Sequence, residues 1–204
     1  MSKIRFVFDL DGTITSVETL PVIAKAFHVH EEMAELTRDT VAGKIPWRRS
    51  FVRRVNLLKH VPVGEIDKLL EKTPTYPDIV SFIQNNSDVC TIATGNLDCW
   101  VGGLCKKIGC DYYSSVATVS DGEVIGIKNI IDKAEVVRNQ QRGVDKVVFI
   151  GDSNNDVEAM RQADVAIAYG ASHMPSKYCL AAADHVVYSE KDLIVLLLDL
   201  QISL

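Results

Sequence analysis

The chain has 204 residues, of which 47% are hydrophobic and 24% charged, a balance that suits one globular domain with at most a small inserted subdomain. Its 22 basic residues are outnumbered by 27 acidic residues, and the resulting net charge of −5 argues against a broad basic surface for nucleic acid. Asp9 interrupts the N-terminal apolar run too early for a secretory signal or a membrane span.

The sequence contains five cysteines, an odd number whose spacings do not match those of a zinc site. Because no export signal is visible, we interpret them as reduced thiols that pack like small apolar side chains. The sequence therefore predicts a cytoplasmic protein without a membrane or nucleic-acid partner, and it leaves the oligomeric state open.

The first predicted strand, IRFVFDL (residues 4–10), is apolar at successive positions and ends in acidic residues. Strands of the same character are predicted at 88–96, 146–152, 164–170 and 185–189, and helical periodicity is found between them at 78–86, 97–108, 130–142, 154–162 and 190–200. Strands that are apolar on both faces, alternating with helices, predict an α/β fold with a doubly wound, largely parallel sheet.

One long segment breaks this alternation. Apolar residues recur at helical spacing from Leu20 to Phe27, and further helices are predicted at 31–42, 46–59 and 63–72. We therefore expect residues 15–75 to form a helical cap inserted after the first strand, with residues 1–14 and 76–204 as the catalytic core. Residues 117–127 predict a hairpin that turns at Asp121-Gly122.

Several polar residues follow the predicted strands, and open α/β sheets bind ligands at the carboxyl ends of their strands. These residues are Asp9 and Asp11 after the first strand, Thr94, Gly95 and Asn96 after the second, Asp152, Asn155 and Asp156 after the third, and Lys133 on the segment that leads into the third. Carboxylates gathered at one edge repel each other, and a magnesium ion would relieve this repulsion. We expect Asp9 and Asp152 to be its side-chain ligands.

The spacing of the first two acidic residues suggests that they have different catalytic roles. Asp9 and Asp11 are two positions apart in an extended segment, so we expect both to point toward the same reacting centre. One carboxylate can then act as a nucleophile while the other transfers protons. The hydroxyls of Thr13 and Thr94 are expected to hold phosphate oxygens, and Lys133 is expected to supply a positive charge.

These residues carry a resemblance to a known family. DLDGT (9–13), Thr94, Lys133 and GDSNND (151–156) resemble the four motifs of the haloacid dehalogenase superfamily of phosphohydrolases. The resemblance implies a Rossmann-like fold, bound Mg²⁺ and a phosphoaspartate intermediate on Asp9. It also implies a small phosphomonoester substrate and a contribution from the backbone carbonyl of Asp11 to the metal site.

The predicted cap resembles that of phosphoserine phosphatases, through VETLPVIAKAF (17–27) and VAGKIPWRRSFVRRVNLL (41–58). The resemblance implies that Glu18 binds the substrate amino group, that Arg54 binds its carboxylate, and that Val41 and Trp47 cover it. In the family a glycine stands where this chain has Asn96, close to the expected substrate backbone.

Some alternatives remain open. Thr15 and Glu18 have the spacing of a capping box, which would give Glu18 a structural role. Arg53 competes with Arg54 as the carboxylate ligand, and Asp156 is expected to orient the metal ligands rather than bind the metal. The five histidines are expected at the surface, without a metal-binding role.

Other functions are compatible with the same residues. The phosphoaspartate could serve a phosphatase of another small metabolite, or a phosphotransferase or mutase that passes the group to a sugar hydroxyl. A receiver-like signalling domain also combines acidic residues, Thr and Lys on a parallel sheet, but it needs no helical insertion after the first strand. The insertion therefore favours an enzyme.

Overall fold

The structure, a computed structural model, describes residues 3–41 and 43–202. Its strands are β1 (Ile4–Phe8), β2 (Cys90–Leu97), β3 (Asp111–Ser120), β4 (Glu123–Asn129), β5 (Lys146–Gly151), β6 (Val165–Tyr169) and β7 (His185–Val187). Its helices are α1 (Thr19–Ala26), α2 (His30–Val41), α3 (Trp47–Leu58), α4 (Val63–Leu70), α5 (Pro77–Asn85), α6 (Asp98–Ile108), α7 (Lys133–Gln140), α8 (Val157–Gln162), α9 (Lys177–Ala182) and α10 (Glu190–Ile202).

The strands of the described residues form one sheet in the order β4-β3-β2-β1-β5-β6-β7. Every neighbouring pair is parallel except β3 and β4, which form an antiparallel hairpin at one edge. Its turn residues, Asp121 and Gly122, both have positive φ, as a tight hairpin turn requires. The predicted α/β class and the predicted hairpin are therefore confirmed, although β3 begins at Asp111, earlier than its sequence pattern indicated.

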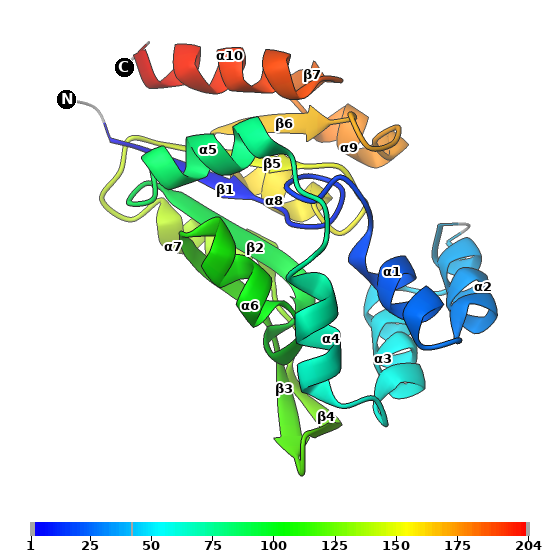
Figure 1. Cartoon of the computed structure of the whole chain (residues 1–204). Helices are drawn as coiled ribbons and strands as arrows, with labels where there is room; N and C mark the ends of the chain where they lie inside the picture. Colours follow the sequence, from blue (N-terminus) through cyan, green and yellow to red (C-terminus); the bar gives the residue numbers. More distant parts are fainter. Residues whose placement is uncertain (1–2, 42, 203–204) are drawn as a thin grey trace.

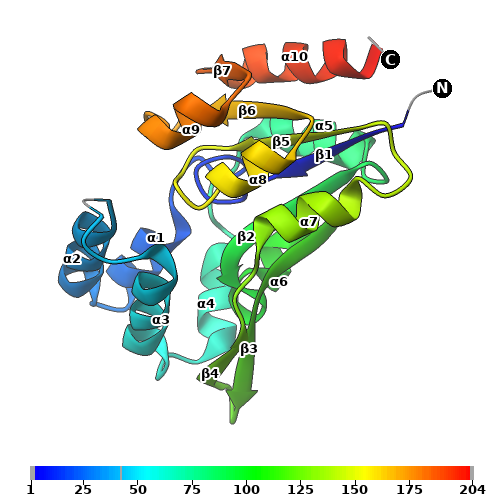
Figure 2. The ribbon, with the colours of Figure 1, turned by 180° about the vertical axis from the view of Figure 1, so that it is seen from behind.

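Both faces of the sheet are buried, which explains the continuous apolar runs. In β1, Phe6 and Phe8 belong to the larger core while Val7 belongs to the smaller one, because alternate side chains point to opposite faces. The larger core includes residues of α5, α6 and α10, and the smaller core includes residues of α7, α8 and α9. Figures 1 and 2 show these two groups of helices on opposite sides of the sheet.

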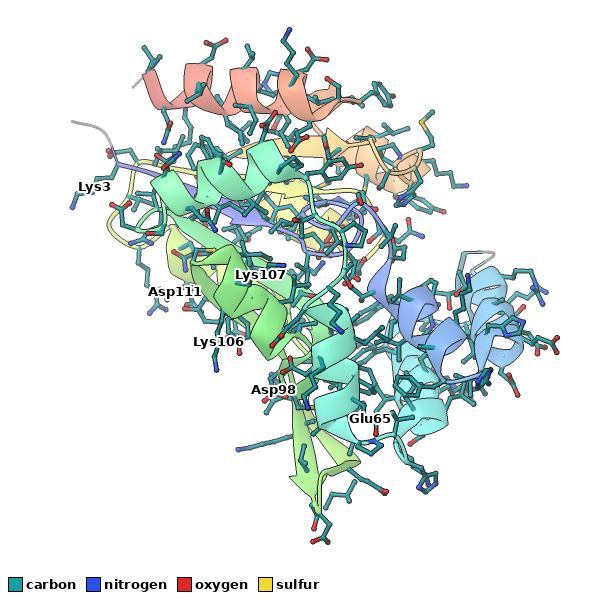
Figure 3. All side chains as sticks on the ribbon, viewed as in Figure 1. Lys3, Glu65, Asp98, Lys106, Lys107 and Asp111 are labelled. Atoms are coloured by element: carbon teal, nitrogen blue, oxygen red, sulfur yellow. The ribbon has the colours of Figure 1, made fainter. Side chains whose placement is uncertain are left out.

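Helix α6 illustrates how local sequence supports this layering. Its buried positions, such as Trp100 and Leu104, face the larger core. Asp98 begins the helix and Lys106 and Lys107 lie in its last turn (Figure 3), so these charges complement the helix dipole. Gly109 ends it in the left-handed conformation.

Helices α1, α2 and α3 lie beyond one edge of the sheet, as Figure 1 shows, and α3 contacts the hairpin strand β4. Helix α4 instead packs against α6, where the N–H of Gly103 donates to Asp67 Oδ1 over 2.8 Å. The segments that enter and leave this helical region are paired: Thr15 and Thr75 form an antiparallel bridge, and Tyr76 N–H donates to the carbonyl of Ile14 over 2.9 Å. This arrangement supports a separate cap, and its boundary at residues 15–75 stays a prediction.

Two details of the sequence analysis need correction. The capping box is wrong, because α1 begins after Glu18, whose side chain makes no capping hydrogen bond, and the Thr15 hydroxyl donates to nearby backbone carbonyls. Helix α9 lies in a segment where no helix was predicted, and Ser176 caps it by accepting from the N–H of Cys179. None of the described helices combines the length and apolar character needed to cross a bilayer.

Candidate active site

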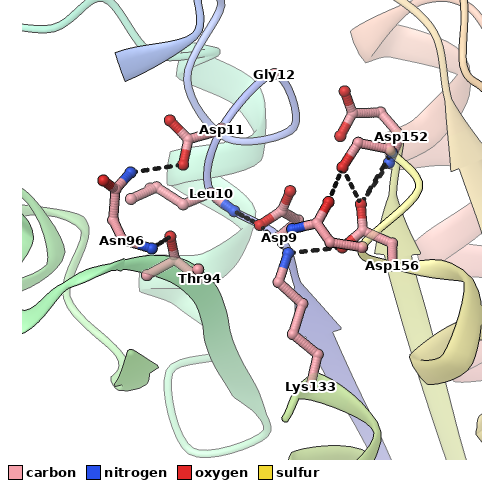
Figure 4. Close-up of polar contacts among 12 residues, drawn as sticks. Asp9, Leu10, Asp11, Gly12, Thr94, Asn96, Lys133, Asp152 and Asp156 are labelled. Carbon is pink, nitrogen blue, oxygen red and sulfur yellow. Dashed lines mark hydrogen bonds and ion pairs between the residues drawn. The ribbon is translucent and has the colours of Figure 1, made fainter. Parts of the chain in front are cut away.

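The carboxyl ends of β1, β2 and β5 meet at one edge of the sheet, and Figure 4 shows the polar side chains gathered there. Asp9 directly follows β1, and its N–H donates to the carbonyl of Ile150 in β5 over 2.8 Å. Gly12 then turns the chain away with a φ of +73°, a left-handed conformation that glycine adopts easily. The structure thus brings together residues that are more than 140 positions apart.

Lys133 is the buried cation of this edge. Its Nζ lies 2.6 Å from Asp9 Oδ1 and 2.6 Å from Asp156 Oδ1, and all three side chains are at most 4% exposed. Lys133 is the first residue of α7, which Asp132 caps by accepting from the N–H groups of Ala134 and Glu135. The helix start therefore fixes where the lysine enters the site.

Asp156 has its hydrogen-bonding capacity filled. One oxygen binds Lys133, and the other accepts from the N–H of Asp152 over 3.2 Å and from the N–H and hydroxyl of Ser153 over 2.9 and 3.1 Å. A carboxylate held in this way is suited to orient its neighbours rather than to bind a ligand.

The electrostatic balance of the site favours an added cation. Burial raises the pKa of Asp9 well above its usual range, Asp156 raises it further, and Lys133 opposes them. Burial likewise raises the pKa of Asp152 to about 6, which the neighbouring His173 opposes. One lysine is thus insufficient to neutralise the carboxylates around it.

The donor atoms present fit a magnesium ion. Carboxylate oxygens of Asp9, Asp152 and Asp156 lie within 4.8 Å of one another. Both carboxylate oxygens of Asp152 are buried; among the described residues Oδ1 has no hydrogen-bond partner and Oδ2 has His173 Nε2 alone, a costly arrangement that a cation would relieve. Because Asp156 is already occupied, Asp9 and Asp152 are the side chains that could hold the ion.

Asp11 has a different set of partners from Asp9. Its Oδ1 accepts from the N–H of Thr19 over 2.9 Å and from the Thr19 hydroxyl, and its Oδ2 accepts from the side-chain amide of Asn96 over 2.8 Å. The carboxylate of Asp11 therefore lies at the N-terminus of α1, where the helix dipole favours negative charge. Its side chain is bound to the cap and to β2.

Two hydroxyl groups are available at the same edge. The buried Thr13 hydroxyl has no hydrogen-bond partner among the described residues. Thr94 Oγ1 accepts from the N–H of Asn96 over 3.2 Å, which leaves its proton available to donate. Both groups can therefore donate to oxygen atoms of a bound ligand, and their role toward phosphate stays a prediction.

Helix α3 brings an aromatic side chain over the end of β2. The Trp47 ring stacks on Phe51 and packs so closely on Gly95 that a Cβ there would lie 2.7 Å from it. Asn155 Nδ2 lies 3.7 Å from the same position. Val41 is the last residue of α2, and its side chain is not among the parts of the chain that the structure describes.

Arg54 and Glu18 are the charged residues expected to bind an amino-acid substrate. The Arg54 guanidinium donates to the hydroxyl of Thr37 over 3.1 Å, while burial lowers its pKa and Glu18 opposes that shift. Burial raises the pKa of Glu18 to about 8, and Asp11 and Asp152 raise it as well. A carboxyl group in this environment is stabilised by a nearby cation, such as an ammonium group.

The sequence analysis missed one residue of this region. His173 follows β6, and its Nε2 lies 2.9 Å from Asp152 Oδ2 and close to Glu18, a group of potential metal ligands that the sequence analysis did not anticipate, although the ring is exposed as expected. The signal was available, because His173 comes soon after a predicted strand whose carboxyl end lies at the same sheet edge.

Comparison with known proteins gives the family. The sequence model of the haloacid dehalogenase-like hydrolases matches residues 6–161, three quarters of the chain and all of the motifs above. The chain belongs to this family. It is 28% identical over 186 residues to a phosphoserine phosphatase of Methanocaldococcus jannaschii, an alignment that covers 83% of this chain and 86% of that one.

A second relative and a solved structure show the same similarity to phosphoserine phosphatases. A phosphoserine phosphatase of Archaeoglobus fulgidus is 26% identical, and this chain spans only 54% of its length. The structure of a phospho-aspartyl intermediate analogue of phosphoserine phosphatase superimposes with a TM-score of 0.78 at 25% identity, covering 95% of this chain and 97% of that one. This haloacid dehalogenase-like hydrolase thus resembles phosphoserine phosphatases in fold and sequence.

Proposed function

We propose that the chain is a magnesium-dependent phosphomonoester hydrolase that acts through a phosphoaspartate on Asp9. The observation that carries this proposal is the placement of Asp9, which is buried, bonded to Lys133 and adjacent to Asp152. The N–H of Leu10 and Lys133 Nζ both donate to Asp9 Oδ1, at 2.7 and 2.6 Å. Oδ2 is consequently the oxygen better placed to attack phosphorus.

The chain's own residues suit the remaining steps. Lys133 keeps Asp9 oriented and spreads positive charge toward the phosphoryl oxygens, and the hydroxyls of Thr13 and Thr94 donate to those oxygens. Asp11 gives a proton to the leaving alkoxide and takes one from the water that later hydrolyses the phosphoaspartate. Magnesium held by Asp9 and Asp152 would neutralise charge on the carboxylates and the phosphoryl group.

We further propose an amino-acid phosphate, with phosphoserine as the first candidate, as the substrate. The support is the similarity to phosphoserine phosphatases and the presence of Glu18 and Arg54 in the cap, where they match the substrate ammonium and carboxylate. Trp47, Gly95, Asn96 and Asn155 would line the remainder of the binding site. The free thiols of the five cysteines support a cytoplasmic location.

The test is Asp9→Asn, measured by phosphate release from p-nitrophenyl phosphate with Mg²⁺. The amide cannot attack phosphorus, so turnover is expected to fall to the background rate while the circular dichroism spectrum stays unchanged. Asp121→Asn, in the exposed hairpin turn, is the control and should keep full activity. Fluorine NMR should detect beryllofluoride bound to the wild type and not to Asp9→Asn, and residual turnover by a folded Asp9→Asn variant would reject the mechanism.

A further inference from the structure

Three potential metal ligands converge beside the predicted magnesium site from three different segments. Glu18 directly precedes α1, Asp152 follows β5 and His173 follows β6. One ligand atom from each, two carboxylate oxygens and one imidazole nitrogen, lie within 4.8 Å of one another. Only Asp152 is shared with the cluster formed by Asp9 and Asp156.

The backbone leaves space for this convergence at Gly12. A Cβ on Gly12 would lie 2.8 Å from Asp152 Oδ2, 3.1 Å from His173 Cε1 and 3.2 Å from Glu18 Oε1. The three side chains therefore surround one small region, which any other residue at position 12 would fill. This observation is independent of the charges in the cluster.

Hydrogen bonds fix the orientation of the imidazole. The Ser172 hydroxyl donates to the carbonyl of Gly12 over 2.8 Å, so it must act as the acceptor toward His173 Nδ1, 3.0 Å away. With a proton on Nδ1, Nε2 faces Asp152 Oδ2 at 2.9 Å, where it forms an ion pair when the ring is protonated and can share a cation with Asp152 when it is neutral. A histidine whose second nitrogen is held by a hydroxyl or carbonyl in this way is typical of metal ligands.

Asp152 can serve two cations. Its carboxylate is completely buried; among the described residues Oδ1 has no hydrogen-bond partner, and Oδ2 has His173 Nε2 at 2.9 Å. One oxygen can therefore bind the predicted magnesium ion while Oδ2, the atom next to His173, binds a second ion. Carboxylates bridge cations in this way in two-metal sites.

We propose that Glu18, Asp152 and His173 form a second cation site, selective for a divalent first-row transition metal ion such as Mn²⁺ or Zn²⁺. Imidazole nitrogen suits these ions, whereas Mg²⁺ prefers oxygen ligands. Because Glu18 belongs to the cap and the other two ligands to the core, an ion at this site ties the cap to the sheet. The inference shares Asp152 with the predicted magnesium site and Glu18 with the proposed ammonium contact, so that one oxygen of Glu18 would bind the ion and the other would remain for the substrate.

The experiment uses the full chain freed of metal by a chelator and loaded with Mn²⁺. Pulsed electron paramagnetic resonance is expected to show coupling of the manganese electron spin to a histidine nitrogen, and the coupling pattern should change when the histidines are labelled with nitrogen-15. The coupling should disappear in His173→Ala. It should persist in His60→Ala, whose side chain is exposed beside Glu123 in the hairpin, far along the chain from this site.

Affinity provides a second readout that does not depend on enzyme activity. His173→Ala is expected to weaken Mn²⁺ binding by at least about 10-fold and to change Mg²⁺ binding much less, because loss of a nitrogen ligand matters chiefly for the transition metal. Absence of nitrogen coupling in the wild type, or equal loss of affinity for both ions in the variant, would overturn the second site. Magnesium-dependent phosphate release by the wild type would remain as the separate test of the proposed function.

Discussion

The side-chain amide of Asn96 donates to Asp11 Oδ2 over 2.8 Å, which ties the end of β2 to the loop that follows β1. If Asp11 transfers the proton, loss of this contact should disturb its orientation. Asn96→Ala is expected to lower kcat for alkyl phosphates by about 10-fold, the loss of about 1.4 kcal/mol that suits a hydrogen bond to a charged group. The fall should be smaller for p-nitrophenyl phosphate, whose phenolate leaves without a proton. An equal loss on both substrates would remove this role from Asn96.

Arg54 allows a test of the substrate class. Arg54→Ala should lower kcat/KM for phosphoserine by about 10- to 100-fold, since one charge-assisted contact is worth about 1.5–3 kcal/mol. p-Nitrophenyl phosphate has no carboxylate, so its turnover should hardly change. Arg53→Ala is the matched control, because Arg53 is exposed on the same helix. A parallel loss on both substrates would argue against an amino-acid phosphate.

Removal of metal should make stability depend on pH. In the metal-free chain the pKa of Asp152 is raised from 3.8 to about 6 and that of Glu18 from 4.5 to about 8, chiefly by burial. The folded state then retains protons that the unfolded state has lost, so the free energy of unfolding should fall as the pH rises from about 4 to 8. Thermal unfolding in the presence of a chelator, followed across this range, measures the effect.

Magnesium should offset that loss. An ion that binds only the folded chain adds about 2.7 kcal/mol at 100 times its Kd, which corresponds to an increase in Tm of about 5–10 °C for a chain of this size. The increase should be largest above pH 7, where the carboxylates are most in need of a cation. A Tm that does not respond to Mg²⁺ at pH 8 would contradict the predicted metal site.

Trp47 reports the position of the cap. A Cβ on Gly95 would lie 2.7 Å from its ring, so Gly95→Ala should displace Trp47 from the strand ends. We expect a change in tryptophan fluorescence together with a rise in KM for phosphoserine. Gly126→Ala is the control, since a Cβ there would meet no atom within 4 Å. If fluorescence and KM are unchanged in Gly95→Ala, the Trp47 ring does not need its position on Gly95 for substrate binding.

The sheet was predictable because its signals are local or depend on a general rule. Runs such as 146–152 are apolar on both faces, and the rule that carboxyl ends of parallel strands share an edge brought Asp9, Thr94 and Asp152 together. The positions of Asp9, Asp152 and Lys133 relative to one another therefore followed from topology. What topology leaves open is which way each side chain points.

The missed features depend on contacts between distant segments. The capping box at Thr15 was a plausible local interaction, but the N-terminal region of α1 is instead held by Asp11, which binds the first helical residue, Thr19. The position of His173 depends on the hydrogen bond from its neighbour Ser172 to the carbonyl of Gly12, and these two residues are 160 positions apart in sequence. Such pairings cannot be derived from periodicity, because they require the folded arrangement of loops.

The paired segments at Thr15 and Thr75 have a consequence for how this fold can diversify. Because the chain enters and leaves the helical region at adjacent points, a short connector between residues 16 and 74 would bridge the gap at little entropic cost. The helical region can consequently be exchanged as a cassette, provided that the new segment covers α6 as α4 does. Under the proposed roles, the residues of phosphate chemistry and two of the proposed substrate ligands, Glu18 and Arg54, would then belong to separately replaceable parts of one chain.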